Sequence, residues 1–234
     1  MNNKELMIVL ILGTVLMCIP IMMQMNNYQI PKWKSLFVSV MLVFTGLIGS
    51  RFWYYVENGT NIGRSFYGVV FIAPFVFGPV AKVLRITYGH MMDLLAPAGC
   101  LTLALVKIQC LRDGCCDGKP LYIDKNRNYV KFPSQIAEMV TFLVIFILLM
   151  VIGKKKSMQK KIYPTFLVLY GGSRFVLNFF RDGIVPYALG LSAGSFWSLI
   201  STIVGAVALI ICTRLDKVKT REVLPYAIKA STRQ

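Results

Sequence analysis

The sequence predicts an all-α integral membrane protein, folded as a seven-transmembrane-helix bundle. Of its 234 residues 56% are apolar and only 15% are charged, and the mean hydropathy is +0.62. A soluble domain of this length carries more charge than that. Seven apolar runs of about 18 to 25 residues are each long enough for a helix to cross about 30 Å of hydrocarbon. The same composition excludes a disordered chain and a disulfide-stapled miniprotein.

The predicted spans cover most of the chain. The uninterrupted apolar run at 140–152 excludes a membrane β-barrel, whose strands alternate apolar and polar residues. We expect the first run to be a spanning helix and not a cleaved signal, because Lys4 is offset by Glu5 and no small-residue cleavage pattern follows. We place the spans at 6–25, 35–56, 66–84, 91–111, 133–153, 163–181 and 192–213.

The distribution of basic residues predicts the orientation. Lys and Arg number 26 against 10 Asp and Glu, for a net charge of +16, and many gather in the 154–161 loop and after Arg214. Basic loops resist translocation, so we expect the amino terminus outside and the carboxyl terminus in the cytoplasm. Residues 1–213 are then the transmembrane domain and 214–234 a basic cytoplasmic tail. We attribute the charge to contact with anionic headgroups, with no nucleic acid as partner.

Three basic residues, Arg51, Lys107 and Arg174, fall inside the predicted spans. A charge at mid-depth costs about 3 kcal/mol or more, so each is by default a candidate functional residue. The alternative is that the side chain extends to an interface, which suits Arg51 and, less well, Lys107. Arg174 follows Pro164 by ten residues, about 15 Å along a helix, which places it near the middle of the bilayer.

A polar stripe is predicted on the sixth span. Arg174, Asn178 and Arg181 are spaced i, i+4 and i+7 and would share one helical face. Gly171 and Gly172 precede them and allow neighbouring backbones to approach closely, as in a packed bundle wall. We therefore expect the stripe to face the interior.

The fifth span carries Gln135 and Glu138 on a shared face. A carboxylate in hydrocarbon needs a cation, which Arg174, Arg51 or Lys107 could supply. A purely structural ion pair is the alternative to a functional role.

The outer half of the predicted bundle is net positive. Acidic residues there are few, Glu138 and Asp113, while Asp93 lies at the cytoplasmic end, where we expect it to cap or pair. Such a pocket suits the phosphate of an anionic phospholipid, since arginine offers bidentate hydrogen bonds. Charge alone does not separate a lipid enzyme from an anion transporter. The basic residues of this half are Arg51, Lys107, Arg112, Arg174 and Arg181.

Several short motifs between residues 49 and 199 occur in the order typical of one family. They are GSRFWYY from Gly49, SFYG from Ser65, DLLAP from Asp93, KIQCLRDGCCDG from Lys107, FPSQIAE from Phe132, GGSRFVLNFFRDG from Gly171 and LSAGSFWSL from Leu191. The chain resembles the prolipoprotein diacylglyceryl transferase family through this ordered set.

The resemblance implies transfer of a diacylglyceryl group from phosphatidylglycerol to the lipobox cysteine thiol of a preprolipoprotein signal peptide, in the bacterial plasma membrane. The products would be a thioether and glycerol phosphate. It implies no metal or organic cofactor, and we expect a monomer. The implied catalytic residues are Arg174, Tyr67, Glu138 and Lys107, and those that bind the lipid phosphate are Arg51, Arg112, Asn178, Arg181, Gln135 and Gly118.

The sequence departs from the family pattern at several positions. Tyr67 stands where familiar members have His, Lys107 stands for an arginine, and Asn178 stands for a glutamate. Tyrosine, with a reference pKa near 10, is a poor base at neutral pH. It could hydrogen-bond the lipid or belong to an interfacial aromatic belt. A peptide thiol could also lose its proton in a positive field without a dedicated base.

Two further classes of function stay open from the sequence. One is a related phospholipid headgroup reaction with another acceptor, or a binding or transport protein on the same scaffold. The other is redox or soft-metal chemistry at Cys115 and Cys116, with Cys110 nearby. The sole histidine, His90, lies at the cytoplasmic end of the fourth span, which disfavours a zinc site in this loop.

Overall fold

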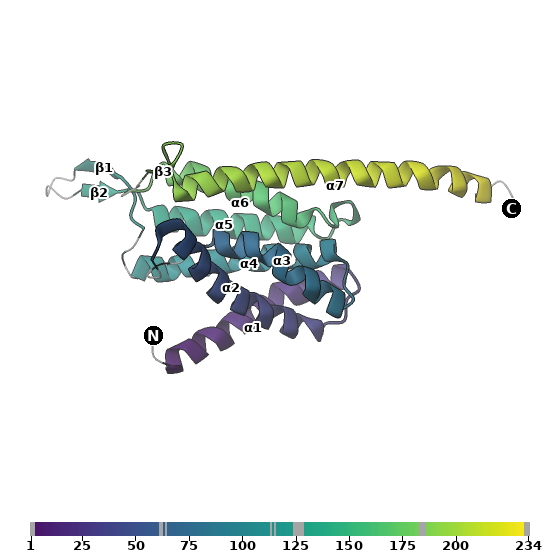
Figure 1. Cartoon of the computed structure of the whole chain (residues 1–234), viewed down its shortest axis with the longest axis horizontal. Helices are drawn as coiled ribbons and strands as arrows, with labels where there is room; N and C mark the ends of the chain where they lie inside the picture. Colours follow the sequence, from purple (N-terminus) through teal and green to yellow (C-terminus); the bar gives the residue numbers. More distant parts are fainter. Residues whose placement is uncertain are drawn as a thin grey trace.

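The computed structural model describes residues 3–60, 63, 65–112, 114, 116–123, 129–182 and 186–231, and within these ranges it contains seven α-helices (Figure 1). They are α1 (Asn3–Asn27), α2 (Lys34–Asn58), α3 (Tyr67–Val83), α4 (Tyr88–Arg112), α5 (Ser134–Ile152), α6 (Ile162–Asn178) and α7 (Ala193–Ser231). Each predicted span corresponds to one of these helices. The bounds of the helices agree closely with the predicted spans except for α7, which continues without a break past the predicted end of the last span.

Two short hairpins add to the predicted all-α architecture. Strands β1 (Pro120–Ile123) and β2 (Tyr129–Lys131) pair antiparallel between α4 and α5, and β3 (Pro186–Ala188) pairs with β4 (Leu191–Ser192) between α6 and α7. Both hairpins lie at the same end of the bundle, opposite the end from which α7 extends (Figure 1). Gly114, between α4 and β1, has a φ of +61°, a conformation that glycine adopts readily. Strands this short leave no signal in an analysis of helix-length apolar runs.

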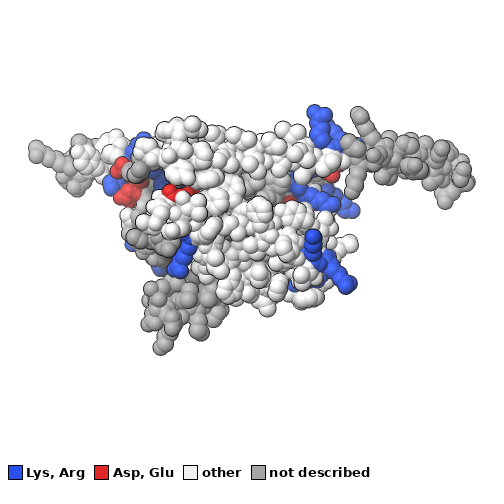
Figure 2. Space-filling view, viewed as in Figure 1, with Lys and Arg blue, Asp and Glu red and all other residues white. Residues whose placement is uncertain are grey.

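Four helices of the described chain are long and apolar enough to cross a membrane: α2, α4, α5 and the part of α7 from Ala193 to Lys217. Helix α3 is apolar but shorter. Figure 2 shows the charged residues of one face gathered near the two ends of the bundle, with a broad uncharged band between them. Large apolar side chains such as Phe75 and Ile48 are exposed on the helices. This surface matches a hydrocarbon environment, in which apolar side chains face outward.

The end of the bundle opposite the hairpins is organised by a buried carboxylate. Asp93 of α4 accepts hydrogen bonds from the backbone N–H groups of Lys160, at 2.5 Å, and Tyr163, at 3.1 Å, and from the Tyr28 hydroxyl, at 3.2 Å. It thereby satisfies donors at the start of α6, which the helix itself leaves unpaired. The expectation that Asp93 caps at this end is confirmed.

Close backbone approach joins α6 to α7. A Cβ added at Gly171 would lie 2.5 Å from Thr202 Oγ1 and 2.6 Å from the Ser198 carbonyl oxygen, both in α7. The neighbouring Gly172 has open space, with no atom within 4 Å of such a Cβ. The sequence prediction of close packing at this glycine pair therefore holds for Gly171 alone.

The glycine pair offers a matched test of this contact. Gly171→Ala should destabilise the protein by about 1 to 3 kcal/mol, because the methyl group overpacks against α7. Gly172→Ala should leave stability unchanged or raise it by up to about 1 kcal/mol, because alanine favours the helix. Thermal unfolding of the purified proteins in detergent measures both, and equal effects of the two substitutions would contradict the packing described here.

Candidate functional site

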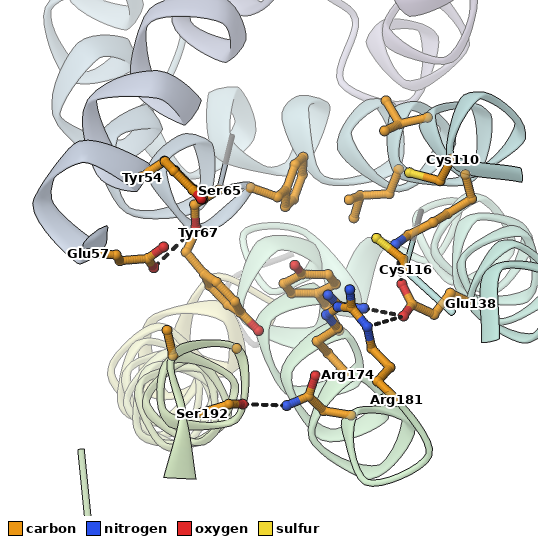
Figure 3. A pocket seen from close by; sticks show the side chains of 18 of the residues that line it. Tyr54, Glu57, Ser65, Tyr67, Cys110, Cys116, Glu138, Arg174, Arg181 and Ser192 are labelled. Atoms are coloured by element: carbon orange, nitrogen blue, oxygen red, sulfur yellow. Dashed lines mark hydrogen bonds and ion pairs between the residues drawn. The ribbon is translucent and has the colours of Figure 1, made fainter. Parts of the chain in front are cut away.

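A polar cavity of about 490 Å³ opens at the hairpin end of the bundle, and all helices from α2 to α7 contribute to its lining (Figure 3). One wall carries Lys107, Glu138, Arg174 and Arg181, and the other carries aromatic and hydroxyl side chains. Basic residues that sequence reasoning placed on two separate spans, the fourth and the sixth, therefore meet in one chamber.

The centre of the basic wall is Glu138 of α5, which is fully buried. Its Oε2 lies 2.6 Å from Lys107 Nζ of α4, and its Oε1 forms an ion pair with Arg174 of α6. The Nε of Arg181 lies 3.9 Å from the same Oε1. Three cations thus surround one carboxylate, and the cluster keeps a net charge of about +2. The sequence-based expectation that Glu138 meets a cation is met by Arg174 and Lys107, and not by Arg51.

Arg181 reaches this cluster from outside the helix. Because α6 ends at Asn178, Arg181 does not lie on the predicted helical face with Arg174. Instead, backbone pairing with the loop after α4 holds Arg181 in place. Gly118 forms an antiparallel β-bridge with Arg181, the Lys119 N–H donates to the Phe180 carbonyl oxygen at 2.8 Å, and the Asp182 N–H makes a further backbone hydrogen bond to the same loop.

Gly118 serves this pairing and does not line the cavity. A Cβ at Gly118 would lie 2.1 Å from the Phe132 carbonyl oxygen, so only glycine fits between the two backbone segments. The structure thus gives Gly118 a packing role that positions the backbone of Arg181, and its role as a lipid ligand stays a prediction.

Gln135 is likewise buried beside the cavity without lining it. Its Nε2 donates to Asp117 Oδ1 at 3.2 Å, and the other oxygen of Asp117 lies 2.7 Å from Lys131 Nζ. The hydrogen bond from Lys131 holds the pKa of Asp117 below its usual range, so this loop carboxylate stays ionised. Ser134 Oγ adds a hydrogen bond to the Cys116 carbonyl oxygen. These contacts fasten the loop after α4 to the start of α5.

Asn178 lines the cavity and joins α6 to the start of α7. Its Nδ2 donates to Ser192 Oγ at 2.5 Å and to Ser195 Oγ at 2.6 Å. Its amide therefore has partners within the protein, and it orders the cavity wall next to Arg174.

Tyr67 lies at the start of α3 with only 4% of its surface exposed, so it is not part of an interfacial aromatic belt. Its hydroxyl lies 2.5 Å from Ser198 Oγ of α7. Its ring packs against Tyr170 with 5.6 Å between centroids. Tyr67 thus lines the cavity as part of an aromatic wall and has its hydroxyl engaged by a serine.

Two predicted phosphate ligands lie away from the cavity. The side chains of Arg51 on α2 and Arg112 at the end of α4 are exposed, and neither residue lines the chamber. The expected convergence of Arg51 with Arg174 is therefore not found in this structure. The alternative interpretation, that Arg51 extends toward an interface, agrees with its exposed side chain.

The cavity also contains groups that sequence reasoning missed. Glu57, Ser65, Tyr170 and Ser192 all line it. Ser65 and Ser192 fall within motifs that carry the family resemblance but were assigned no role, whereas Glu57, in the last turn of α2, and Tyr170, within α6, fall outside those motifs. Among the cysteines, Cys110 and Cys116 line the cavity, whereas Cys115 and the acidic Asp113 lie outside the described residues.

A second, apolar cavity of about 280 Å³ lies directly beside the first. It is formed by α1, α2, α3 and α4, and it shares Phe66, Leu103 and Val106 with the polar cavity as a common wall. A cationic chamber thus adjoins an apolar one inside a membrane bundle.

The fold and the cavity define a membrane protein with a chamber in which basic side chains outnumber the buried carboxylate they surround, and comparisons with known proteins identify its family. The model of the prolipoprotein diacylglyceryl transferase family matches residues 6–211, so the chain belongs to this family. It is accordingly a multi-pass membrane transferase of a bacterial family.

Three relatives are named phosphatidylglycerol–prolipoprotein diacylglyceryl transferase. The one from Clostridium tetani is 24% identical over 191 residues, covering 72% of this chain and 76% of the relative. The one from Geobacter sulfurreducens is 30% identical over 148 residues, covering 60% and 54%. The one from Cupriavidus metallidurans is 29% identical over 167 residues, covering 66% and 60%. The alignments thus span little more than half of the last two relatives.

The buried cluster predicts a large effect of removing its carboxylate. Glu138→Gln should destabilise the protein by about 3 to 5 kcal/mol, because Lys107 and Arg174 would be left buried without a counter-charge. Asp117→Asn is the control, since it also removes a carboxylate from an ion pair, but an exposed one, and should not change stability measurably. Thermal unfolding in detergent compares them, and a Glu138→Gln protein as stable as the control would refute the role given to the cluster.

Proposed function

We propose that this protein transfers a diacylglyceryl group from phosphatidylglycerol to the lipobox cysteine thiol of a preprolipoprotein. The observation that carries the proposal is the excess of positive charge around Glu138, in a chamber at one end of a membrane bundle. An anionic phosphate is the ligand that this excess favours. Family membership and the names of the relatives support the same substrates.

The chemistry is displacement at a primary carbon. The thiolate sulfur attacks the glyceryl carbon, the bond from that carbon to the phosphate oxygen breaks, and its electron pair leaves with glycerol phosphate. Negative charge develops on the departing phosphate, and Arg174, Arg181 and Lys107 are positioned to stabilise it. Glu138 holds these cations in place, so that little reorganisation is needed when the bond breaks. The residues themselves require no metal or organic cofactor for these steps.

The two adjoining cavities suit the two parts of a phospholipid. The headgroup and phosphate occupy the polar cavity, and one acyl chain occupies the apolar cavity across the wall formed by Phe66, Leu103 and Val106. Apolar contact there contributes binding energy away from the reacting atoms, which positions the scissile bond.

We further propose that all seven helices cross the membrane, with the amino terminus and the two hairpins outside and the carboxyl terminus in the cytoplasm. The lysine-rich segment between α5 and α6 lies at the end away from the cavity, where basic residues favour the cytoplasm. On this assignment the chamber opens toward the outer leaflet, where secreted preprolipoproteins arrive. Residues 1–213 form the transferase domain, 214–234 form the tail, and the protein acts as a monomer.

A related lipid reaction with another acceptor is the second candidate. It is favoured by Tyr67, whose hydroxyl is engaged by Ser198 and which stands at the position of a family histidine. Consumption of labelled phosphatidylglycerol without a lipidated peptide would identify this alternative.

Removal of the central arginine tests the proposed reaction. Arg174→Ala should lower the rate of thioether formation between phosphatidylglycerol and a lipobox peptide by about 100-fold or more, because a preorganised donor to the leaving group is lost. Lipidation of the peptide in purified proteoliposomes, followed by mass spectrometry, measures the rate. Lys154→Ala removes a cation from an exposed position outside the cavity and should leave the rate unchanged. Full activity of Arg174→Ala would refute the assignment.

Filling the apolar cavity tests the acyl-chain site. Gly46 lines this cavity and has no atom within 4 Å of an added Cβ, so Gly46→Leu should occupy the space. We expect KM for long-chain phosphatidylglycerol to rise about tenfold, with little change for a short-chain analogue. Gly46→Ala, which adds one methyl group, serves as the control. An equal change in KM for both lipids would argue against an acyl chain in this cavity.

A further inference from the structure

A second carboxylate lines the polar cavity on the side away from the cation cluster. Glu57 lies in the last turn of α2 and is half-buried, and its Oε1 accepts a hydrogen bond from Ser65 Oγ at 3.1 Å. Figure 3 shows Glu57 beside Ser65, with Tyr67 between it and Arg174. Within the described part of the chain, no ion pair joins Glu57 to a cation. It is therefore an acidic group with an open face toward the chamber.

The other titratable groups of the chamber are less suited to accept a proton. Glu138 is held by three cations, which stabilise its ionised form and occupy its oxygens. The Tyr67 hydroxyl is engaged by Ser198, and a phenol with an ordinary pKa near 10 carries its own proton at neutral pH. Asp182 is exposed at the rim of the cavity, in contact with water. Among the described carboxylates that line the cavity, Glu57 alone is both partly shielded and free of a cation.

The position of Glu57 matches the geometry of the displacement. Nucleophile and leaving group lie on opposite sides of the carbon that is attacked. If the cation cluster binds the departing phosphate, the thiol must approach from the opposite wall, and Glu57 stands on that wall (Figure 3). A peptide thiol with a reference pKa near 8.5 is mostly protonated at neutral pH, so a base on that wall would raise the rate.

We infer that Glu57 is the general base that accepts the proton of the incoming thiol, an inference that rests on the proposed function. As the sulfur–carbon bond forms, the thiol proton moves to a carboxylate oxygen of Glu57. The carbon–oxygen bond breaks at the same time, and its electron pair leaves with the phosphate. The protonated Glu57 then returns its proton to water at the open end of the cavity. Ser65, which donates to Oε1, is a positioning residue that orients the carboxylate.

The pH dependence of peptide lipidation by Glu57→Gln tests this role. At pH 7 the variant should be slower than the wild type by about 100-fold, the effect typical of losing a general base. The wild-type rate should depend less steeply on pH from about pH 6 to 8, because the thiol proton passes to Glu57 within the complex and does not have to be lost first in solution. The variant depends on thiolate formed in solution, so its rate should rise nearly tenfold per pH unit up to about pH 8 and level off above about pH 8.5, about 30-fold above its value at pH 7 and still below the wild-type rate.

Two further variants make the result decisive. Glu57→Asp keeps a carboxylate and should retain the wild-type shape of the pH profile at a lower rate. Asp216→Asn removes a carboxylate from an ion pair with Lys161 at the opposite end of the bundle and should leave both rate and profile unchanged.

The outcomes separate this inference from the function on which it rests. A wild-type protein that forms no thioether would overturn the proposed function. An active wild type with an unchanged Glu57→Gln profile would overturn the inference alone. A loss of rate that is the same at every pH would also overturn it, because it would show that Glu57 binds the headgroup or supports the fold and does not take the proton.

Discussion

The buried bridge at Glu138 is the interaction on which the rest of the site depends. One carboxylate without solvent contact holds Lys107 from α4 and Arg174 from α6 and attracts Arg181 from the following turn. In a bilayer these cations would otherwise be expelled toward an interface, since a lone charge at that depth is costly. Because the bridge neutralises only part of their charge, the same contact that makes the bundle stable leaves the chamber attractive to an anion.

The surrounding elements keep this cluster in register. Gly118 allows the loop after α4 to pair with the backbone of Arg181, and Gly171 allows α7 to lie close to α6. Asn178 then ties the start of α7 to the wall of the cavity. Small residues and backbone hydrogen bonds thus supply precision where the lipid offers no hydrophobic force between helices. At the opposite end, Asp93 fixes the start of α6 through its backbone N–H groups.

The chamber is chemically divided. Its cationic wall suits a phosphate, Tyr67 and Tyr170 form an aromatic wall, and Glu57 provides a carboxylate on the far side. The apolar cavity across Phe66 extends the site into the hydrophobic part of the bundle. This arrangement fits a lipid that reacts at the boundary between its headgroup and its chains, and it accounts for the departure from the family pattern at Tyr67 without requiring the phenol to act as a base.

The sequence by itself determined the number and approximate bounds of the helices, because hydrocarbon thickness fixes the length of an apolar run. It also marked Lys107, Glu138 and Arg174, because charges in such runs are rare. Only the tertiary structure decided which charges meet. Arg51 and Arg174 both fall inside predicted spans and were both expected to bind phosphate, yet one is exposed and the other is paired with Glu138, since helix rotation and packing set the direction of each side chain. Glu57 carried no signal because a carboxylate at a helix end becomes distinctive only when the bundle closes around it.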